Sequence, residues 1–232
     1  MPNLTGNHLL DGLSDPVRET ILRSAEPMEM PLRTSLYTAD AIPSHLYFLT
    51  AGLASVVVSM REGGTSEVSM VGKDGLSGAI FLLGPKKSAA TCFMQVSGRG
   101  LRVPLSLLRE LFATQEEFRS CILEQMQGIL NVSMQSTGCA ALHEAEARLA
   151  RWLLMTADRA DSESVDLTQE FMAEMMGTQR TTVAVVAGLL RKAGFIDYTR
   201  GRILITDRPG LMEAACECYA VGVDALKKST LA

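Results

Sequence analysis

The stretch that decides the fold is LTQEFMAEMMGTQRTTVAVVAGLLRKAGFIDYTRGRILI, which runs from Leu167 to Ile205. Thr168 is a favourable N-cap, so a short helix is predicted after it, with Met172 and Met176 among its inward side chains. Gly177 then supplies the left-handed backbone that a tight turn between two helices requires. The stretch therefore predicts a short helix, a glycine turn and a second helix.

The second helix is predicted over residues 178–193, and Gly194 ends it. Two helices that cross at a glycine need a small residue where their backbones approach, and Ala173 lies four residues before Gly177. A branched apolar side chain must hold the second helix on the first, and Val183 lies six residues after the glycine. This spacing is typical of a DNA-binding helix-turn-helix, with an ordinary helical hairpin as the alternative. The expected inward side chains of the second helix are Val183, Val186, Leu189 and Leu190.

A basic hairpin is predicted directly after the second helix. A strand opens at Asp197, residues 200–202 (Arg-Gly-Arg) form a tight turn, and residues 203–205 return. Such a hairpin is the wing of a winged helix, and its tip can lie against phosphate. Residues 178–208 carry six basic and two acidic side chains, a net +4, whereas residues 144–177 carry three basic and eight acidic ones, a net −5.

The composition is that of a globular chain of 232 residues, 47% of them hydrophobic. The formal net charge of −4 excludes a protein coated in positive charge, such as a histone-like protein. The five scattered cysteines do not form a disulfide framework and fit reduced thiols. Neither a signal-peptide pattern nor a run of about 18 apolar residues occurs, so we expect a cytoplasmic protein with no membrane partner.

The first part of the chain has the pattern of a β unit. Short apolar or alternating runs occupy residues 45–50, 53–60, 66–71 and 91–96. An antiparallel roll, barrel or sandwich is predicted from about residue 28 to residue 104, and a brief helix at about 15–24 leads into it. The turn formers that separate the runs include Ala51-Gly52, Glu62-Gly63-Gly64, Gly72-Lys73-Asp74-Gly75 and Ser97-Gly98.

A long helix is predicted over about 108–143, because proline is absent and apolar side chains recur at steps of three and four. Apolar groups cover so much of its circumference that we expect one side to pack on the β unit and the other on a second copy of the helix. A helix buried within one monomer is the alternative. The expected dimer stripe is Leu123, Met126, Leu130, Met134, Thr137 and Ala141, and the second stripe is Phe118, Ile122, Met126 and Ile129.

A further helix is predicted over residues 145–157, with Leu149, Trp152, Leu153 and Thr156 along it. A polar stretch at residues 158–166 ends this helix. The expected domains are therefore residues 1–143, which hold the β unit and the dimerisation helix, and residues 144–232, which hold the winged helix.

The β unit, the long helix and the winged helix, in this order, resemble the cyclic-AMP-receptor and Fnr (Crp/Fnr) family of bacterial transcription regulators. The specific motifs lie between Leu167 and Ile205, and the element order covers nearly the whole chain. The resemblance implies an α+β fold, with an N-terminal antiparallel β-roll of the cyclic-nucleotide-binding jelly-roll type and a C-terminal winged helix-turn-helix. It also implies a homodimer on a palindromic operator in double-stranded DNA, with RNA polymerase as a partner.

The resemblance also assigns candidate DNA contacts. Arg180 matches the arginine that in many members reads a guanine, and a guanidinium can bind O6 and N7 of that base together. Thr181 and Val185 stand where well-known members carry a glutamate and an arginine, so the familiar half-site is not expected. The candidate base-reading residues are Gln179, Arg180, Thr181 and Val185. The candidate phosphate contacts are Thr168, Gln169, Thr182, Arg200 and Arg202.

The β unit departs from the family's cyclic-nucleotide pattern. In binders a Gly-Glu-Leu holds the ribose and an Arg-Ser-Ala neutralises the cyclic phosphate, whereas this chain reads GLSGAIFLLGPKKSAATC over residues 75–92. Gly78 stands at the glutamate position, and Lys87 beside Ser88 offers a point charge without the planar fork of arginine. Gly78, Lys87 and Ser88 are the candidate effector pocket, in which we do not expect a cyclic nucleotide.

No metal or cofactor is predicted, and the effector is not identified. An iron–sulfur sensor needs four clustered thiolates, which the N-terminal region lacks. Cys216 and Cys218 are two residues apart on a predicted helix, so we expect them to face different directions. The three histidines, His8, His45 and His143, are far apart in sequence.

Two other classes of function remain as alternatives to the transcription regulator. One is a sensor of haem, a cyclic nucleotide or another small molecule, or of redox state, that binds DNA only when activated. The other is an enzyme on a cupin-like β unit. Because the strands lack a His-x-His metal motif and no nucleophile is paired with a base, no catalytic residue is predicted and an enzyme is not expected.

Overall fold

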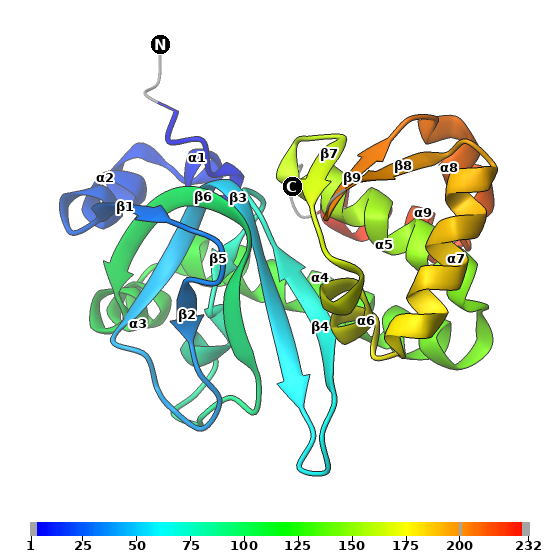
Figure 1. Cartoon of the computed structure of the whole chain (residues 1–232). Coiled ribbons are helices and arrows are strands. Elements are labelled where there is room, and N and C mark those ends of the chain that lie inside the picture. The colour runs from blue at the N-terminus through cyan, green and yellow to red at the C-terminus, as the bar shows by residue number, and fades with distance from the viewer. Residues whose placement is uncertain (1–3, 200, 229–232) are drawn as a thin grey trace. The chain divides into compact units, whose positions relative to one another are not determined.

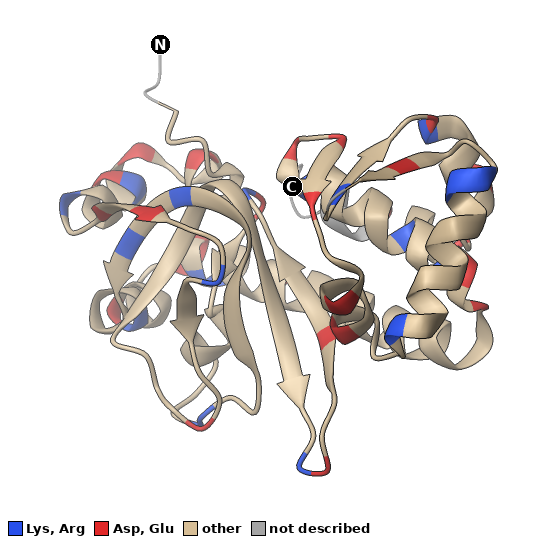
Figure 2. Ribbon diagram, in the orientation of Figure 1, with Lys and Arg blue, Asp and Glu red and all other residues tan. Residues whose placement is uncertain are grey.

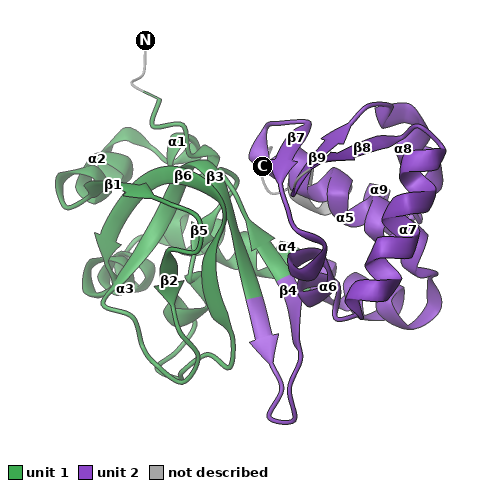
Figure 3. Cartoon of the chain, viewed as in Figure 1, with its two compact units in different colours: residues 1–56, 69–130, 226–232 green, residues 57–68, 131–225 purple. Residues whose placement is uncertain are grey.

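The computed structural model describes residues 4–199 and 201–228. The chain divides by packing into two compact units (Figure 3). Of the described residues, one unit contains 4–56, 69–130 and 226–228, and the other contains 57–68 and 131–225. Most of the strand residues lie in the first unit, and the second unit is mainly helical, so the expected α+β class is confirmed. The domain division predicted after residue 143 stays a prediction.

The first unit holds most of an antiparallel β-roll (Figure 1). The sheet order is β1-β6-β3-β4, with β2 also paired to β6 and β5 to β3. The β unit expected from the sequence is therefore present. Its strands are β1 (Glu26–Met30), β2 (Ser35–Tyr37), β3 (His45–Ser59), β4 (Thr65–Val71), β5 (Leu76–Ser77) and β6 (Thr91–Pro104).

Two glycines that the sequence places in turns lie inside long strands instead. Gly52 is within β3, with a φ of 83°, and Gly98 is within β6. A Cβ on Gly52 would lie 2.8 Å from the Cα of Gly98, and a Cβ on Gly98 would collide with the carbonyl group of Ala51. The predicted turns at residues 51–52 and 97–98 are wrong, because here glycine allows two strand backbones to approach closely.

The core of the first unit consists of apolar side chains from strands and helices together. Phe48, Phe81 and Phe118 are among its largest fully buried side chains, and burial of each contributes about 1.5 to 3 kcal/mol. The helix expected at about residues 15–24 is confirmed as α2. The helical segments before residue 115 are α1 (His8–Gly12), α2 (Asp15–Arg23), the 3-10 helix η1 (Ala79–Leu82) and α3 (Leu105–Thr114).

Helix α4 (Glu116–Leu142) carries the predicted dimer stripe. It begins after Gln115, whose extended backbone (φ −107°, ψ 107°) separates it from α3. The expectation of one continuous helix from about residue 108 is therefore wrong. The carboxylates of Glu116 and Glu117 in the first turn of α4 favour a helix N-terminus at this point.

The two apolar stripes of α4 differ in burial. Phe118 and Ile122 are fully buried, and the side-chain amide of Gln125 hydrogen-bonds to the N–H and the carbonyl of Leu76 at 3.2 and 3.1 Å. The dimer stripe is largely open to solvent in the single chain, with Met126 half-buried and Thr137 and Ala141 exposed. The exposed fractions of its large side chains are 49% for Leu123, 58% for Leu130 and 56% for Met134.

The second unit contains a winged helix (Figure 1). Its three-stranded sheet has the order β7-β9-β8. Strand β7 was not predicted, because Val165 is the one apolar residue among its three. The predicted helix at residues 145–157 is confirmed as α5, with all four named side chains buried. The elements are α5 (Ala145–Ala160), β7 (Ser164–Asp166), α6 (Gln169–Met176), α7 (Arg180–Lys192), β8 (Ile196–Thr199), β9 (Arg202–Ile205), α8 (Arg208–Ala214) and α9 (Cys218–Lys228).

Candidate nucleic-acid interface

The turn between α6 and α7 has the geometry that the sequence predicts. Gly177 adopts the left-handed conformation, with a φ of 59°. The N–H of Thr178 donates to the carbonyl of Ala173 at 3.0 Å, which is the long bond of a Schellman motif. Arg148 of α5 donates to the carbonyl of Met176 at 2.8 Å and so satisfies another acceptor at the end of α6. The turn is therefore fixed by hydrogen bonds as well as by the glycine.

The inner faces of α6 and α7 pack as expected, with one exception. Ala173 and Val183 are buried at the predicted positions, together with Met172, Met176, Val186 and Leu190. Leu189, which was expected to point inward, is 47% exposed, and Ala187 is buried instead. Residues 183, 187 and 190 share one helical face, and residue 189 lies off it. The error arises because Leu189 is apolar without being on the core-facing side.

The outer face of α7 presents the candidate base-reading residues to solvent. Gln179 is the N-cap and Arg180 the first residue of the helix, and both are exposed, as is Thr181. Val185 is 63% exposed. Among the described residues Arg180 forms no ion pair, so its guanidinium is available to a partner. The structure thus brings the four predicted residues to one exposed end of the helix.

The candidates for phosphate contacts have mixed environments. The hydroxyl of Thr168 accepts a hydrogen bond from the N–H of Phe171 at 3.1 Å, which confirms it as the N-cap of α6. Gln169 and Thr182 lie in the first turns of α6 and α7 and are half-buried. Arg200, which the sequence predicts at the tip of the wing, lies outside the described residues.

Arg202, the other wing candidate, is engaged by an acidic residue that the sequence did not single out. Its Nε lies 2.7 Å from Oδ1 of Asp166, and the two residues are paired across β9 and β7. This hydrogen bond and the negative charge of Asp166 raise the pKa of Arg202. The signal that could have found Asp166 is the unpredicted strand β7, whose register places the carboxylate opposite the arginine.

Further basic side chains of this segment are also paired, and Figure 2 shows acidic positions beside basic ones in this unit. The net +4 counted over residues 178–208 therefore overstates the free positive charge at the wing. The pairs are Arg191 Nε with Asp197 Oδ1 at 3.1 Å, Arg208 Nη1 with Glu163 Oε1 at 2.7 Å, and Arg208 with Asp158.

The candidate effector residues of the roll lie in three different environments. Gly78 is buried with a φ of 84°, and a Cβ there would lie 2.6 Å from Cδ2 of Leu46. Ser88 is buried, and its hydroxyl accepts a hydrogen bond from the N–H of Ala90 at 3.0 Å. Lys87 is exposed. The glycine and the serine thus serve the packing and turns of the chain itself.

The surroundings of Gly78 are aromatic and buried. The rings of Tyr37 and Phe81 meet edge to face with their centroids 5.2 Å apart. Burial, and secondly the neighbouring Cys92, raise the pKa of the Tyr37 phenol, so this side chain is neutral at physiological pH. The position that a ribose-binding glutamate would occupy is therefore bordered by close-packed, uncharged side chains.

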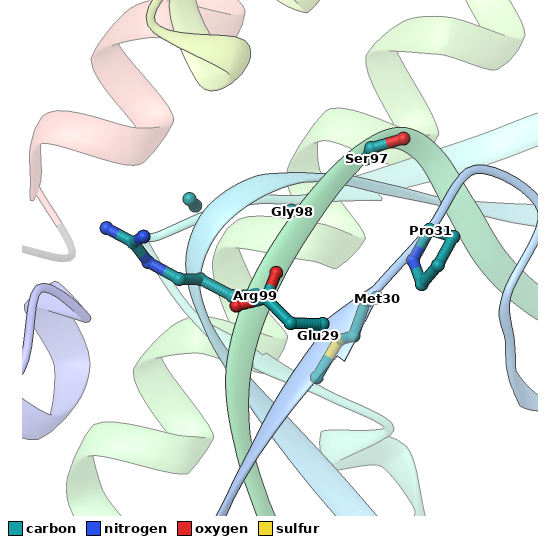
Figure 4. Close-up of a pocket in the computed structure, with 7 residues that line it drawn as sticks. Glu29, Met30, Pro31, Ser97, Gly98 and Arg99 are labelled. Atoms are coloured by element: carbon teal, nitrogen blue, oxygen red, sulfur yellow. The ribbon is translucent and has the colours of Figure 1, made fainter.

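A surface pocket of about 390 Å³ lies elsewhere in the first unit, where β1 runs beside β6 (Figure 4). In this view the guanidinium of Arg99 extends away from Met30 and Pro31. None of the three candidate effector residues lines this pocket. Its lining consists of Glu29, Met30, Pro31, Ala51, Ser97, Gly98 and Arg99.

Known proteins are similar to this chain both in the helix-turn-helix and over most of its length. The family model of the Crp-like helix-turn-helix domain matches residues 147–214. A CRP-like cAMP-activated global transcriptional regulator of Mycobacterium tuberculosis is 22% identical over 216 residues, which cover 89% of this chain and 96% of that protein. The winged helix of this chain is thus a Crp-like helix-turn-helix domain.

Solved structures of Crp/Fnr proteins share the fold of this chain. A transcriptional regulator of the Crp/Fnr family from Eubacterium rectale has a TM-score of 0.71 at 14% identity, over 89% of this chain and 96% of that one. The c-di-GMP responsive global regulator CLP of Xanthomonas campestris has a TM-score of 0.69 at 14% identity, over 83% and 99%. The protein is thus a transcription regulator with a Crp-like helix-turn-helix DNA-binding domain. Within the described residues, no helix of this regulator combines the length and apolar character needed to cross a membrane.

Proposed function

We propose that this Crp/Fnr regulator binds a palindromic operator as a homodimer, with α7 of each protomer in the major groove. The observation that carries the proposal is the contrast between the two faces of α7. Its inner face is buried against α5 and α6, while Gln179, Arg180 and Thr181 are exposed at its N-terminal end. In helix-turn-helix proteins the N-terminal residues of the second helix contact base edges.

The exposed side chains favour particular bases. Arg180 suits O6 and N7 of a guanine, and the amide of Gln179 suits N6 and N7 of an adenine. The methyl groups of Val185 suit a thymine methyl. Leu189 lies about 6 Å further along the helix axis and extends this apolar patch, because four residues of α-helix rise by that distance. We therefore expect a half-site that contains a guanine followed by A·T pairs.

The homodimer is supported by the exposed stripe of α4. Leu123 and Leu130 are one heptad apart and about half exposed, and Met134 lies one turn beyond Leu130. Burial of each large apolar side chain against a second copy of the helix would contribute up to about 1.5 to 3 kcal/mol. This is the pattern of a coiled-coil seam, in which apolar residues repeat every three and four positions.

Few phosphate contacts per protomer are expected, because Arg191, Arg202 and Arg208 are already paired with carboxylates. Each neutralised phosphate contributes about 0.9 to the slope of log affinity against log salt concentration. Specific binding should therefore show a modest salt dependence for a protein of this family.

We propose further that the roll does not bind a cyclic nucleotide through Gly78, Lys87 and Ser88. The buried, left-handed Gly78 and the internally bonded Ser88 support this. A ligand-gated regulator is the second candidate function, because the relatives from M. tuberculosis and X. campestris are named for activation by cAMP and response to c-di-GMP. Either ligand would have to use other residues in this chain.

The test is selection of bound sequences from a random pool of double-stranded DNA, with and without cAMP or c-di-GMP. We expect an inverted repeat with half-sites one helical turn apart, about 10 base pairs centre to centre, selected without added ligand. The variant Leu130→Glu should lose the second half-site, because a charge in the seam prevents dimerisation. Leu83→Glu replaces a similarly exposed leucine in the roll and is the matched control.

Failure to enrich any motif under all conditions would contradict sequence-specific reading. Enrichment only in the presence of a nucleotide would favour the ligand-gated candidate instead. A single half-site selected by the unaltered protein would contradict the dimer.

A further inference from the structure

Four side chains with metal-binding atoms converge in the second unit. The Sγ atoms of Cys139, Cys216 and Cys218 and a ring nitrogen of His143 all lie within 4.8 Å of one another. The two sulfur atoms of Cys139 and Cys216 are 3.5 Å apart, and Sγ of Cys218 is 3.5 Å from Nδ1 of His143. These residues lie outside the DNA-reading face, and the proposed function does not use them.

Two short sequence motifs build this cluster. Cys139 lies in the last turn of α4, and the N–H of His143 donates to its carbonyl at 3.1 Å, so the two side chains share one helical face. Cys216 lies in the turn between α8 and α9, and α9 begins at Cys218. The expectation that Cys216 and Cys218 diverge on one helix is wrong, because the helix includes only the second of them. The N–H of Tyr219 donates to the carbonyl of Cys216 at 3.0 Å and closes this turn.

We propose that Cys139, His143, Cys216 and Cys218 bind one Zn²⁺ ion in a tetrahedral site. Three thiolates and one imidazole are an established donor set of structural zinc sites. With Zn–S bonds of about 2.3 Å, the edges of a tetrahedron are about 3.8 Å between sulfurs and about 3.5 Å between sulfur and nitrogen. The two 3.5 Å separations are close to these edges, so small side-chain rotations suffice to bring all four donors onto one ion.

The groups around the cluster are those that orient metal ligands. Nε2 of His143, the ring nitrogen that faces away from Cys218, lies 3.2 Å from Oε1 of Glu217. A carboxylate on the second nitrogen of a ligating histidine fixes its tautomer and ring orientation. Nε2 of Gln135 donates to Sγ of Cys218 at 3.1 Å, which would stabilise a thiolate.

Charge and burial also suit a closed structural site. Cys139 and Cys218 are each 1% exposed and Cys216 is 8% exposed, so the chain itself supplies four donors and leaves little access for a substrate. Zn²⁺ with three thiolates carries a net charge of −1, and the guanidinium of Arg151 lies close enough to interact electrostatically with Cys139. Within the described part of the chain, the buried Nε of Arg151 has no hydrogen-bond partner.

The bound ion would fasten the α4–α5 turn to the α8–α9 turn inside the second unit. Because Cys139 and Cys216 are 77 residues apart, such a link restrains the unfolded chain strongly, and binding energy adds directly to folding energy. The inference is independent of the operator-reading proposal, since no ligand of the ion is a candidate DNA contact.

The test begins with the unaltered full-length protein under reducing conditions. Metal analysis of the protein as isolated should find one zinc per chain. After removal of zinc, titration with Co²⁺ should give a thiolate-to-cobalt charge-transfer band and the intense visible bands of a tetrahedral site, saturating at one Co²⁺ per chain. Less than one-tenth of that stoichiometry, or the weak spectrum of octahedral cobalt, would overturn the proposal. So would a Cys139–Cys216 disulfide that forms in place of metal binding.

Variants then assign the ligands. Cys216→Ser and His143→Ala should weaken Co²⁺ binding by more than about 100-fold, and Glu217→Gln by about 10-fold through the imidazole it orients. Cys121→Ser alters a free, half-buried cysteine outside the cluster and should leave binding unchanged. Equal binding by Cys216→Ser and the unaltered protein would overturn the assignment. A variant that fails to fold leaves the titration of the unaltered protein as the deciding measurement.

Discussion

The candidate sites of the two compact units differ in how the fold uses their residues. In the roll, Gly78 is buried in a left-handed conformation and Ser88 bonds to its own turn. In the winged helix, Arg180 and Val185 point to solvent from a helix whose opposite face is buried. A side chain already engaged by its own chain must break those contacts to bind a ligand, whereas an exposed one has only water to displace.

A position aligned with a family's binding residue is therefore informative about function only once its local packing is known. The roll keeps the family's architecture, while Gly78 and Ser88 serve its own packing and turns. The winged helix keeps the architecture and leaves the candidate base-reading residues exposed. Substitutions in the two units should therefore affect different quantities, stability in the first and DNA affinity in the second.

The largest expected effect comes from restoring the family's glutamate in the roll with Gly78→Glu. The new side chain would collide with Leu46 and bury an unpaired charge, and its backbone would be held at a positive φ. We therefore expect the free energy of unfolding to fall by about 3 to 5 kcal/mol. Urea denaturation measures this. Gly84→Glu is the control, because a Cβ at Gly84 has no atom within 4 Å, and it should cost less than about 1 kcal/mol. A stable Gly78→Glu protein that binds cAMP would reverse the comparison.

A smaller effect, on affinity alone, is expected for Arg180→Ala in the winged helix. Loss of a bidentate guanine contact should weaken binding to the selected operator by about 1 to 3 kcal/mol and relax selectivity at one base position. The free energy of unfolding should change by less than about 0.5 kcal/mol, since the side chain is exposed. Fluorescence anisotropy with operator and single-base variants measures the affinities. Lys192→Ala removes an equal charge from the other end of α7, and if it relaxed selectivity in the same way, Arg180 would not be a base reader.

The smallest effect is expected at the wing from Asp166→Asn. Removal of the carboxylate frees Arg202 for phosphate, so the magnitude of the salt slope should rise by up to about 0.9 per protomer with little change in base preference. Titrations at several salt concentrations measure this slope. Glu170→Gln is the control, because it removes the same charge from a residue that forms no ion pair in the described part of the chain. The salt slope of this variant should equal that of the unaltered protein. Equal slopes for the two variants would show that Arg202 does not contact phosphate.

Much of the helix-turn-helix could be predicted, because the residues that determine it lie close together in the sequence. Thr168, Gly177 and Val183 lie within 15 residues of one another, and they are confirmed as cap, left-handed turn and buried anchor, respectively. Leu189 was misplaced because hydrophobicity does not report which side of a helix the core covers. Gln115 was missed because an extended backbone at a polar residue leaves no mark in an otherwise helical pattern.

Features that depend on distant segments could not be predicted. Gly52 and Gly98 were assigned to turns, since glycine in sequence does not distinguish a turn from a close approach of two strands. Asp166 was overlooked because its partner Arg202 lies across a strand pair. The cluster of Cys139 and Cys216 joins residues 77 positions apart, and the wrong helix boundary near Cys218 hid it.

Local sequence was enough to predict the order of β-roll, long helix and winged helix, the turn at Gly177 and the candidate residues on α7. These follow from short-range capping, glycine conformation and hydrophobic periodicity. The packing of distant segments was needed to show that Arg202 is paired, that Gly78 is closed to a side chain and that three cysteines and a histidine meet. Each of these depends on which distant backbones pack together, and that is set by the whole core rather than by any local stretch.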